Sequence, residues 1–260
     1  MLINTFDPAL TTKYSGYILR SVRRLSKPVV PYISLSQPFC TVPPSLLEMV
    51  GFDLEDVYRD FNVYRSFGWT EEMATVFEAV KVYGSRVVEH RHELPRRSVS
   101  QVIDQRNLIQ YMILSLPPSN LTVGNAEDNW KLALYECCRL ALVMYSLSVV
   151  FPTSAIVNSF ETLVERLYDV LEIRFPIFIT LAWTHAPISR VLQWVITLGS
   201  IIAQDTSYQS KYSTMLHALL AQEHYRDFED FKRSALEPIL WIDTACDHAA
   251  RDLWDSVVMV

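Results

Sequence analysis

Glycine is scarce in this chain. The 260 residues include only six glycines, against roughly eighteen at the average usage of about 7%. Tight turns between strands and phosphate-binding loops both need glycine, because it adopts their backbone angles without strain. This composition argues against a sheet-rich fold and against a nucleotide-binding loop.

Cysteine is scarcer still, and its spacing argues against the common structural metal sites. The four cysteines are Cys40, Cys137, Cys138 and Cys246. None forms a Cys-x-x-Cys pair, which a structural zinc site normally contains. A disulfide framework is also not expected in a chain of this length. We therefore predict buried thiols in a reducing compartment, with no metal and no cofactor.

An excess of positive charge and long apolar runs are missing as well. The formal net charge is −6, which opposes bulk attraction to nucleic acid, because phosphate binding requires cationic side chains. The N-terminus lacks the basic start and apolar run of a secretory signal. The most apolar run, Val191 to Ala203, contains polar residues and is too short to span a bilayer. We therefore expect no direct nucleic-acid contact and no membrane contact.

Hydrophobic residues are abundant, and they recur at helical spacing. They make up 50% of the chain, and in most segments they fall three or four residues apart, as on one face of a helix. The thirteen prolines lie mostly between these segments, where they end helices. We predict an all-α fold of about ten helices in a single compact domain over residues 1–260, because no flexible linker is visible. The expected helices cover residues 8–26, 45–50, 53–67, 70–93, 98–116, 126–150, 153–174, 188–203, 207–222, 227–236 and 236–258. The aromatic segment 175–186 gives a weaker pattern.

The closing stretch, Leu236 to Val258, is predicted to organise the fold by packing against the helix Ile188–Ala203. An apolar row with helical spacing runs along it: Ile239, Ile242, Cys246, Ala249 and Leu253. Two tryptophans, Trp241 and Trp254, flank that row. A polar row at four-residue steps is typical of a solvated face: Asp243, Asp247, Arg251 and Asp255.

One charged pair is expected inside the protein. Glu136 and Arg139 lie one turn apart on a helix whose other positions are apolar. A buried or half-buried ion pair that locks helix packing explains them better than a ligand does. Asp243 is interpreted in the same way, as a structural partner of Arg139 or Arg106.

Three segments taken together resemble the fungal-specific transcription factor domain, the helical regulatory region that follows the zinc binuclear cluster in many fungal regulators. They are Ile103–Pro117, which ends in Leu-Ser-Leu-Pro; Tyr135–Ser146 with Val150–Pro152, which begins Tyr-Glu-x-x-Arg; and Val191–Ala203 with Ile239–Trp254, which holds two Leu-Trp pairs. The resemblance covers roughly residues 100–257. It implies an all-α regulatory domain.

One feature of that family is absent from this sequence. No segment offers the spacing of the six cysteines that bind zinc and read DNA. The resemblance therefore does not carry direct DNA binding to this chain. Two interpretations stay open: a regulatory fragment, or a stand-alone relative that has been turned to another use.

The candidate ligand site is an aromatic one. Four residues could wall an apolar cavity with a few polar groups, as small-molecule sites require: Phe178, Trp183, His185 and Trp194. The plainer interpretation is that these rings fill the core. No residue pattern identifies a catalytic group.

Two functions follow as expectations. The first is a fungal transcription-factor-type regulatory or ligand-binding domain, whose partner is a hydrophobic small molecule or a regulatory protein, in the nucleus. The second is a repurposed enzyme of secondary metabolism, a cyclase or pericyclase acting on a hydrophobic polyketide or terpenoid, in the cytoplasm. It would act by positioning, which needs few titratable residues. A dimerisation module, forming a homodimer, is a third interpretation.

Overall fold

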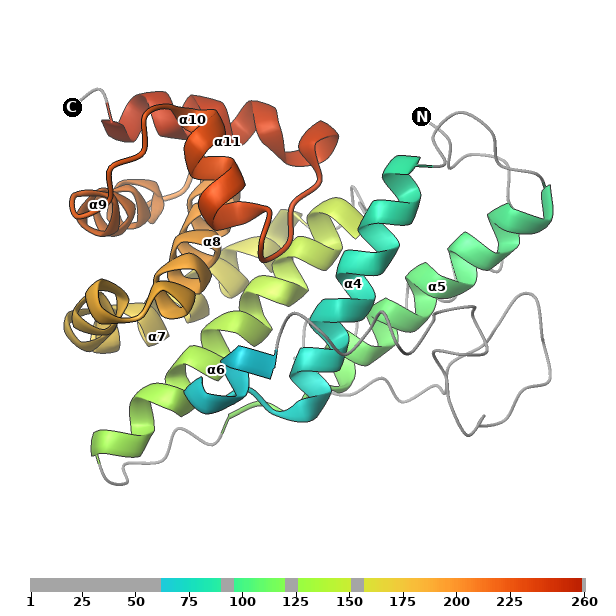
Figure 1. Cartoon of the computed structure of the whole chain (residues 1–260), viewed down its shortest axis with the longest axis horizontal. Helices are drawn as coiled ribbons and strands as arrows, with labels where there is room; N and C mark the ends of the chain where they lie inside the picture. Colours follow the sequence, from blue (N-terminus) through green and yellow to red (C-terminus); the bar gives the residue numbers. More distant parts are fainter. Residues whose placement is uncertain (1–61, 90–95, 120–125, 151–156, 259–260) are drawn as a thin grey trace.

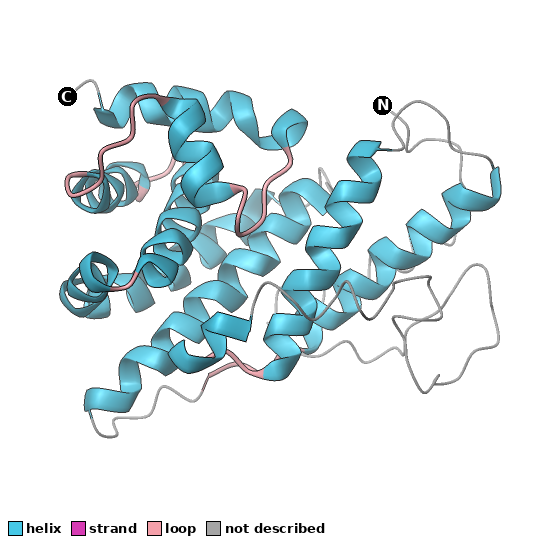
Figure 2. Ribbon diagram, viewed as in Figure 1, coloured by secondary structure: helices cyan, strands magenta, loops and turns pink. Residues whose placement is uncertain are grey.

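Helices account for every regular element in the part of the chain that is described. The computed structural model describes residues 62–89, 96–119, 126–150 and 157–258, and Figure 2 shows helices and loops but no strand in these ranges. This confirms the all-α prediction. The predicted count of about ten helices is corrected to eight α-helices within these ranges. The predicted helices 8–26 and 45–50, most of 53–67, and Cys40 lie outside them.

The elements are η1 (Asn62–Phe67), α4 (Glu71–Glu89), α5 (Arg96–Ser115), α6 (Ala126–Tyr145), η2 (Ser146–Val150), α7 (Val157–Thr184), α8 (Ala186–Ile202), α9 (Gln209–Leu220), α10 (Phe228–Phe231), η4 (Lys232–Leu236) and α11 (Asp243–Val258).

Two predicted helix boundaries are wrong, and proline is involved in both. The helix expected to stop at Arg174 continues to Thr184 as α7, with Pro176 inside it. The Thr180 hydroxyl donates a hydrogen bond of 2.9 Å to the carbonyl oxygen of Pro176, as threonines often do to the preceding turn. The closing helix, expected from Leu236, begins only at Asp243 because the segment around Pro238 forms turns instead.

Helix α8 lies among α6, α7, α9 and α11 (Figure 1). It contacts η1, α6, α7, α9, η4 and α11, and every residue from Val191 to Ser200 is buried. The Trp194 indole nitrogen donates a hydrogen bond of 2.8 Å to the Leu240 carbonyl oxygen. The expected packing of the closing stretch against this helix is thereby confirmed.

Helix α6 packs beside α8. The residues Asn129–Val150, which span most of α6 and all of η2, are apolar and numerous enough to cross a bilayer, but 89% of the apolar window is buried inside the protein.

Helices α7, α8 and α9 meet at one close contact. A Cβ atom added to Gly199 of α8 would lie 2.5 Å from Cε1 of Tyr212 on α9. The Tyr212 hydroxyl donates a hydrogen bond of 2.8 Å to the Val164 carbonyl oxygen of α7. The ring is therefore fixed at both ends, and only glycine leaves room for it.

The predicted buried ion pair is confirmed. Arg139 donates two hydrogen bonds to the Glu136 carboxylate, from Nε at 2.9 Å and from Nη2 at 2.7 Å. The Ser119 backbone N–H donates a third, at 3.1 Å, so this pair also fastens the chain after α5 to α6. Burial by itself raises the pKa of Glu136, but the Arg139 hydrogen bonds and charge outweigh it, and the pKa is lowered. The Asp243 side chain is outside the described ones, so its predicted pairing stays a prediction.

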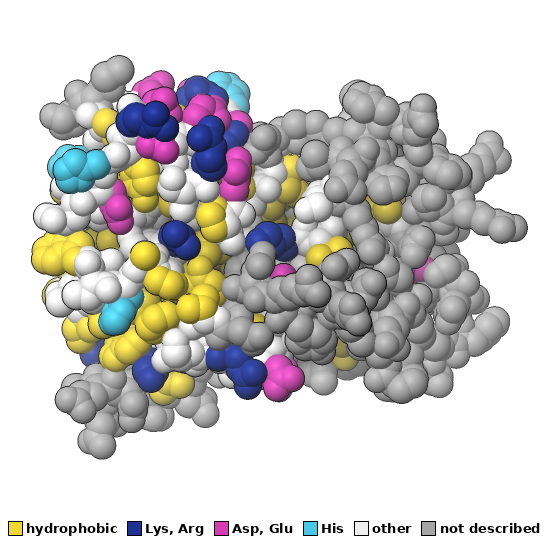
Figure 3. All heavy atoms as spheres, viewed as in Figure 1, with side chains coloured by type: hydrophobic (Ala, Val, Ile, Leu, Met, Phe, Trp, Pro, Cys, Tyr) yellow, Lys and Arg dark blue, Asp and Glu magenta, His cyan; other side chains and the backbone are white. Residues whose placement is uncertain are grey.

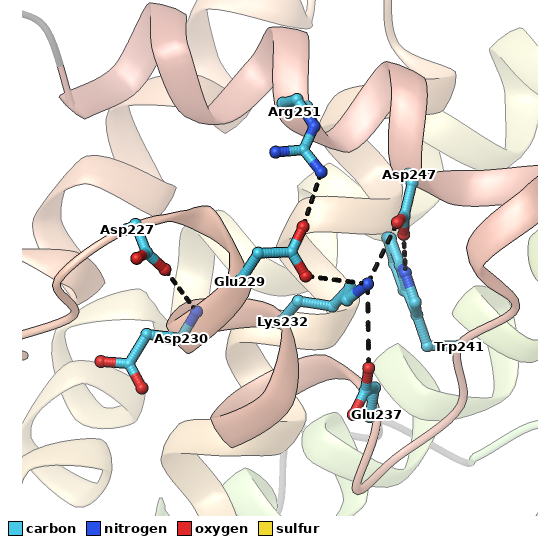
Figure 4. A network of polar contacts seen from close by, with 8 residues as sticks. All are labelled: Asp227, Glu229, Asp230, Lys232, Glu237, Trp241, Asp247 and Arg251. Carbon is cyan, nitrogen blue, oxygen red and sulfur yellow. Dashed lines mark hydrogen bonds and ion pairs between the residues drawn. The ribbon is translucent and has the colours of Figure 1, made fainter.

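A second charged network fastens the C-terminal segment (Figure 4). The buried Lys232 ammonium of η4 lies 3.1 Å from Glu229 and 3.1 Å from Asp247 of α11. Asp247 also accepts a hydrogen bond of 2.7 Å from the Trp241 indole, and Arg251 donates one of 2.6 Å to Glu229. The predicted solvated polar row is thus wrong at Asp247, which holds α11 against η4. Cys246 is buried, as predicted.

Candidate functional site

Two of the four predicted ligand-binding residues lie in the hydrophobic core. Phe178 and Trp194 are both fully buried. The Trp194 ring packs against Phe77, with 5.6 Å between ring centroids, and against Tyr145, with 6.2 Å. These rings fill the interior between α4, α6 and α8, as the plainer interpretation of the sequence expects.

The other two predicted residues lie at the surface, where α7 ends and α8 begins. Trp183 is 55% exposed, and His185, the residue before α8, is also exposed. The His185 ring lies 5.6 Å from the ring of Phe67, centroid to centroid, so η1 borders the same spot. Among the described residues, no ring contact joins this exposed pair to the buried pair.

The chain segment around Trp183 contains no charged residue, and part of it is an exposed apolar surface. No Asp, Glu, Lys or Arg occurs between Arg174 and Arg190. Ile173 and Ile177, one turn apart on α7, are 70% and 38% exposed. Figure 3 shows hydrophobic side chains gathered on the face where α7 ends and α8 begins. Exposed apolar groups that gather in this way are typical of an interaction site. We call Ile173, Ile177 and Trp183 the α7 apolar patch.

Sequence reasoning did not find this patch, although a signal was present. Of the three patch residues, only Trp183 belongs to the predicted ligand site, where it is expected to wall a cavity because aromatic side chains are more often buried than exposed. The missing charge over the whole run from Phe175 to Ser189 could have indicated a surface used for contact. Which of these residues face outward is decided by the continuation of α7 through Pro176, which the sequence pattern did not predict.

A polar network, also not foreseen from the sequence, ties the loop after α9 to the first turns of α8. The Ser189 hydroxyl donates a hydrogen bond of 2.9 Å to Glu223, and the Gln193 amide donates one of 2.9 Å to Ser189. The Tyr225 hydroxyl donates one of 2.8 Å to the Gln193 side-chain oxygen. Burial, together with the Glu223 charge, raises the pKa of Tyr225 to about 12. The four side chains form hydrogen bonds with one another, so we interpret the network as structural support for the α7–α8 corner.

The interior offers no activated nucleophile among the described groups. Burial raises the pKa of the Cys137 and Cys138 thiols, and it raises the pKa of the Tyr145 and Tyr212 hydroxyls. All four groups are therefore protonated at neutral pH, and a protonated thiol is a poor nucleophile. Within the described ranges, no three His, Cys, Asp or Glu side chains gather as metal ligands would.

The chain matches no family model, no curated protein and no solved structure. The resemblance to the fungal-specific transcription factor domain therefore stays a prediction, based on the sequence segments alone. The α7 apolar patch, together with the α7–α8 corner beside it, is therefore the structural basis for a proposed function.

Proposed function

We propose that this chain is a helical regulatory domain of the type that its sequence resembles, and that it acts by binding a protein through the α7 apolar patch. The observation that carries the proposal is the 55% exposure of Trp183. Tryptophan is the residue most enriched at the energetic centres of protein interfaces, and it is costly to leave in water.

Three features of the surroundings support this function. The patch lies at the corner of two long helices, so a rigid surface is presented to the partner. The hydrogen bonds of Ser189 and Gln193 to the loop after α9 hold that corner in place. The same two helices are fixed to the core by Phe178 on α7 and Trp194 on α8, which are both fully buried. Preorganisation of this kind reduces the conformational entropy that binding costs.

The experiment joins the whole chain to a heterologous DNA-binding module and measures transcription of a reporter. The Trp183→Asp fusion is expected to lose most of the reporter response, while Val258→Asp, a change at another half-exposed apolar residue, is expected to keep it. Equal responses from the wild-type, Trp183→Asp and Val258→Asp fusions would overturn the proposal. Circular dichroism of the purified variants checks that both fold.

A second candidate, binding of an apolar metabolite in the interior as effector or substrate, is supported by one observation. The Thr197 hydroxyl, one turn after Trp194 on α8, is buried and has no hydrogen-bond partner among the described residues. A guest with a polar group would satisfy it, because buried polar groups are nearly always paired. Native mass spectrometry with apolar fungal metabolites tests this candidate. Bound metabolite that is lost in Thr197→Val would favour it.

A further inference from the structure

The outward face of α7 carries acidic residues as well as the apolar patch. Exposed carboxylates follow one another along the first part of the helix: Glu161, Glu165, Asp169 and Glu172. Their spacings of four, four and three residues place them on one face of the helix. Trp183 comes eleven residues, about three turns, after Glu172, so it lies on the same face.

In the described part of the chain, these four carboxylates have no ion-pair partner. Glu172 accepts a hydrogen bond of 2.7 Å from the Tyr168 hydroxyl. The ammonium group of Lys211, a neighbour on α9, lies over the rings of Tyr168 and Tyr208, at 4.6 and 4.9 Å from their centroids. The four carboxylates outnumber the cations beside them, Arg166 of the same helix and Lys211, so the stripe keeps a net negative charge.

The local field reflects this excess of acid. Burial raises the pKa of the Tyr208 hydroxyl, and the charges of Glu165, Asp169 and Glu161 raise it further. Lys211 is a cation that already lies beside the stripe, held by the faces of two tyrosine rings, which attract cations. The acidic residues and Trp183 thus lie along one face of α7, and Ile173 and Ile177 lie on the adjoining side of the same helix.

We infer that this face of α7 binds a cationic amphipathic helix, with its basic side chains against the acidic stripe and its apolar side chains against Ile173, Ile177 and Trp183. Charge complementarity selects this occupant over others. An anionic membrane would be repelled by the four carboxylates, and a second copy of α7 would bring two acidic stripes together. The inference rests on the proposed function, because it names the chemistry of the partner that the same patch takes.

The test uses the whole chain and a synthetic helical peptide of leucine and lysine, about six turns long to match the face from Glu161 to Trp183. Binding is measured by isothermal titration calorimetry at low and at high salt. We expect binding that weakens at least about tenfold between the two salt concentrations, because the exposed charges are screened. A matching peptide of leucine and glutamate should not bind.

Matched variants separate this surface from general attraction to an acidic protein. The double charge reversal Glu165→Lys with Asp169→Lys is expected to weaken peptide binding at least about tenfold. The control reversal, Asp252→Lys with Asp255→Lys on α11, changes the net charge by the same amount and should leave binding nearly unchanged. Trp183→Asp should weaken binding to a similar extent, whereas Val258→Asp should not.

The other outcomes count against the inference or against the proposed function. Equal losses from the two charge reversals would show non-specific attraction. Loss with Trp183→Asp alone would show an apolar partner without basic groups, which leaves the proposed function standing. A dimer in analytical ultracentrifugation that Trp183→Asp dissociates would identify a second copy as the occupant. Wild-type binding to phosphatidylserine vesicles would identify a lipid surface. If Trp183→Asp leaves the reporter unaffected while peptide binding is lost, the proposed function fails but the binding surface stands.

Discussion

At the scale of single residues, Arg139 is a buried charge whose stability depends on a single partner. It is a fully buried guanidinium, and Glu136 supplies the only counter-charge that the described contacts show. Removing one partner of a buried pair leaves the other charged and without compensation, which typically costs about 3–5 kcal/mol. We predict a loss of that size for Glu136→Gln, measured by urea denaturation.

The double variant Glu136→Leu with Arg139→Met provides the control for this prediction. An apolar pair of similar volume avoids both desolvated charges, so its loss should be well below the sum of the single losses. Additive losses would contradict the view that the two side chains act as one buried pair.

Gly199 gives a second prediction at this scale. Gly199→Ala forces a methyl group against a tyrosine ring that is held by its own hydrogen bond. Overpacking of this kind costs typically about 1–3 kcal/mol, more than the helix propensity gained by replacing glycine. Gly84→Ala is the matched control, since its nearest neighbour would be Cδ1 of Ile242 at 3.4 Å. Thermal denaturation should show a lowered Tm for the first variant and an unchanged or raised Tm for the second.

The two tryptophans of the predicted ligand site should behave in opposite ways. Trp194→Ala removes a fully buried ring, for which a loss of about 3–5 kcal/mol is typical. Trp183→Ala removes a ring that is more than half exposed, so its effect should stay within about 0.5 kcal/mol. The free energy of unfolding from denaturant titration distinguishes them. Similar losses for both would mean that Trp183 is part of the core.

At the scale of elements, α11 is attached by charge as much as by packing. Its Trp254 ring stacks on Phe231 with 5.1 Å between centroids, and its Asp247 reaches the buried Lys232 ammonium. Lys232→Met removes the cation and leaves Glu229 and Asp247 facing each other, so we predict local release of α11. Hydrogen–deuterium exchange should show faster exchange over Asp243–Val258.

The control for this prediction is an exposed ion pair nearby. Arg226, whose side chain is 78% exposed, pairs with Asp230, and exposed pairs contribute about 0–1 kcal/mol. Arg226→Met should therefore leave the exchange of α11 unchanged. Faster exchange in both variants would show that the end of the chain is generally sensitive, and not fastened by Lys232 in particular.

At the scale of the whole molecule, the shifted pKa values set a range of pH in which the fold is most stable. The pKa of Glu136 is lowered from 4.5 in the folded state, so the stability it contributes is present above 4.5 and is lost as the pH falls through the folded value. The pKa values of Cys137 and Tyr145 are raised from 9.0 and 10.0. Their contribution is present below those values and is lost as the pH rises further. We predict that the free energy of unfolding is greatest between about pH 5 and pH 9.

Denaturant midpoints measured across the pH range test this prediction. Glu136→Gln should flatten the acidic limb, and Tyr145→Phe should reduce the slope of the alkaline limb while leaving the acidic one unchanged. A profile that does not change in either variant would mean that other groups dominate the titration.

The sequence by itself determined the fold class and much of the core. Helical spacing predicted the α-helices, because one apolar face must be buried whatever lies opposite to it. It also predicted the Glu136–Arg139 pair, since both partners belong to one helix and their separation is fixed by the helix itself. The same reasoning predicted a buried helix at Val191–Ala203.

Only the tertiary structure decided which aromatic residues face inward. Trp183 and Trp194 have similar neighbours in the sequence, yet one is exposed and the other is the centre of the core, because α7 continues through Pro176 before the chain turns into α8. Contacts between distant segments, such as Lys232 with Asp247 or Gly199 with Tyr212, depend on how helices pack. Periodicity fixes the faces of each helix but not the neighbours that those faces meet.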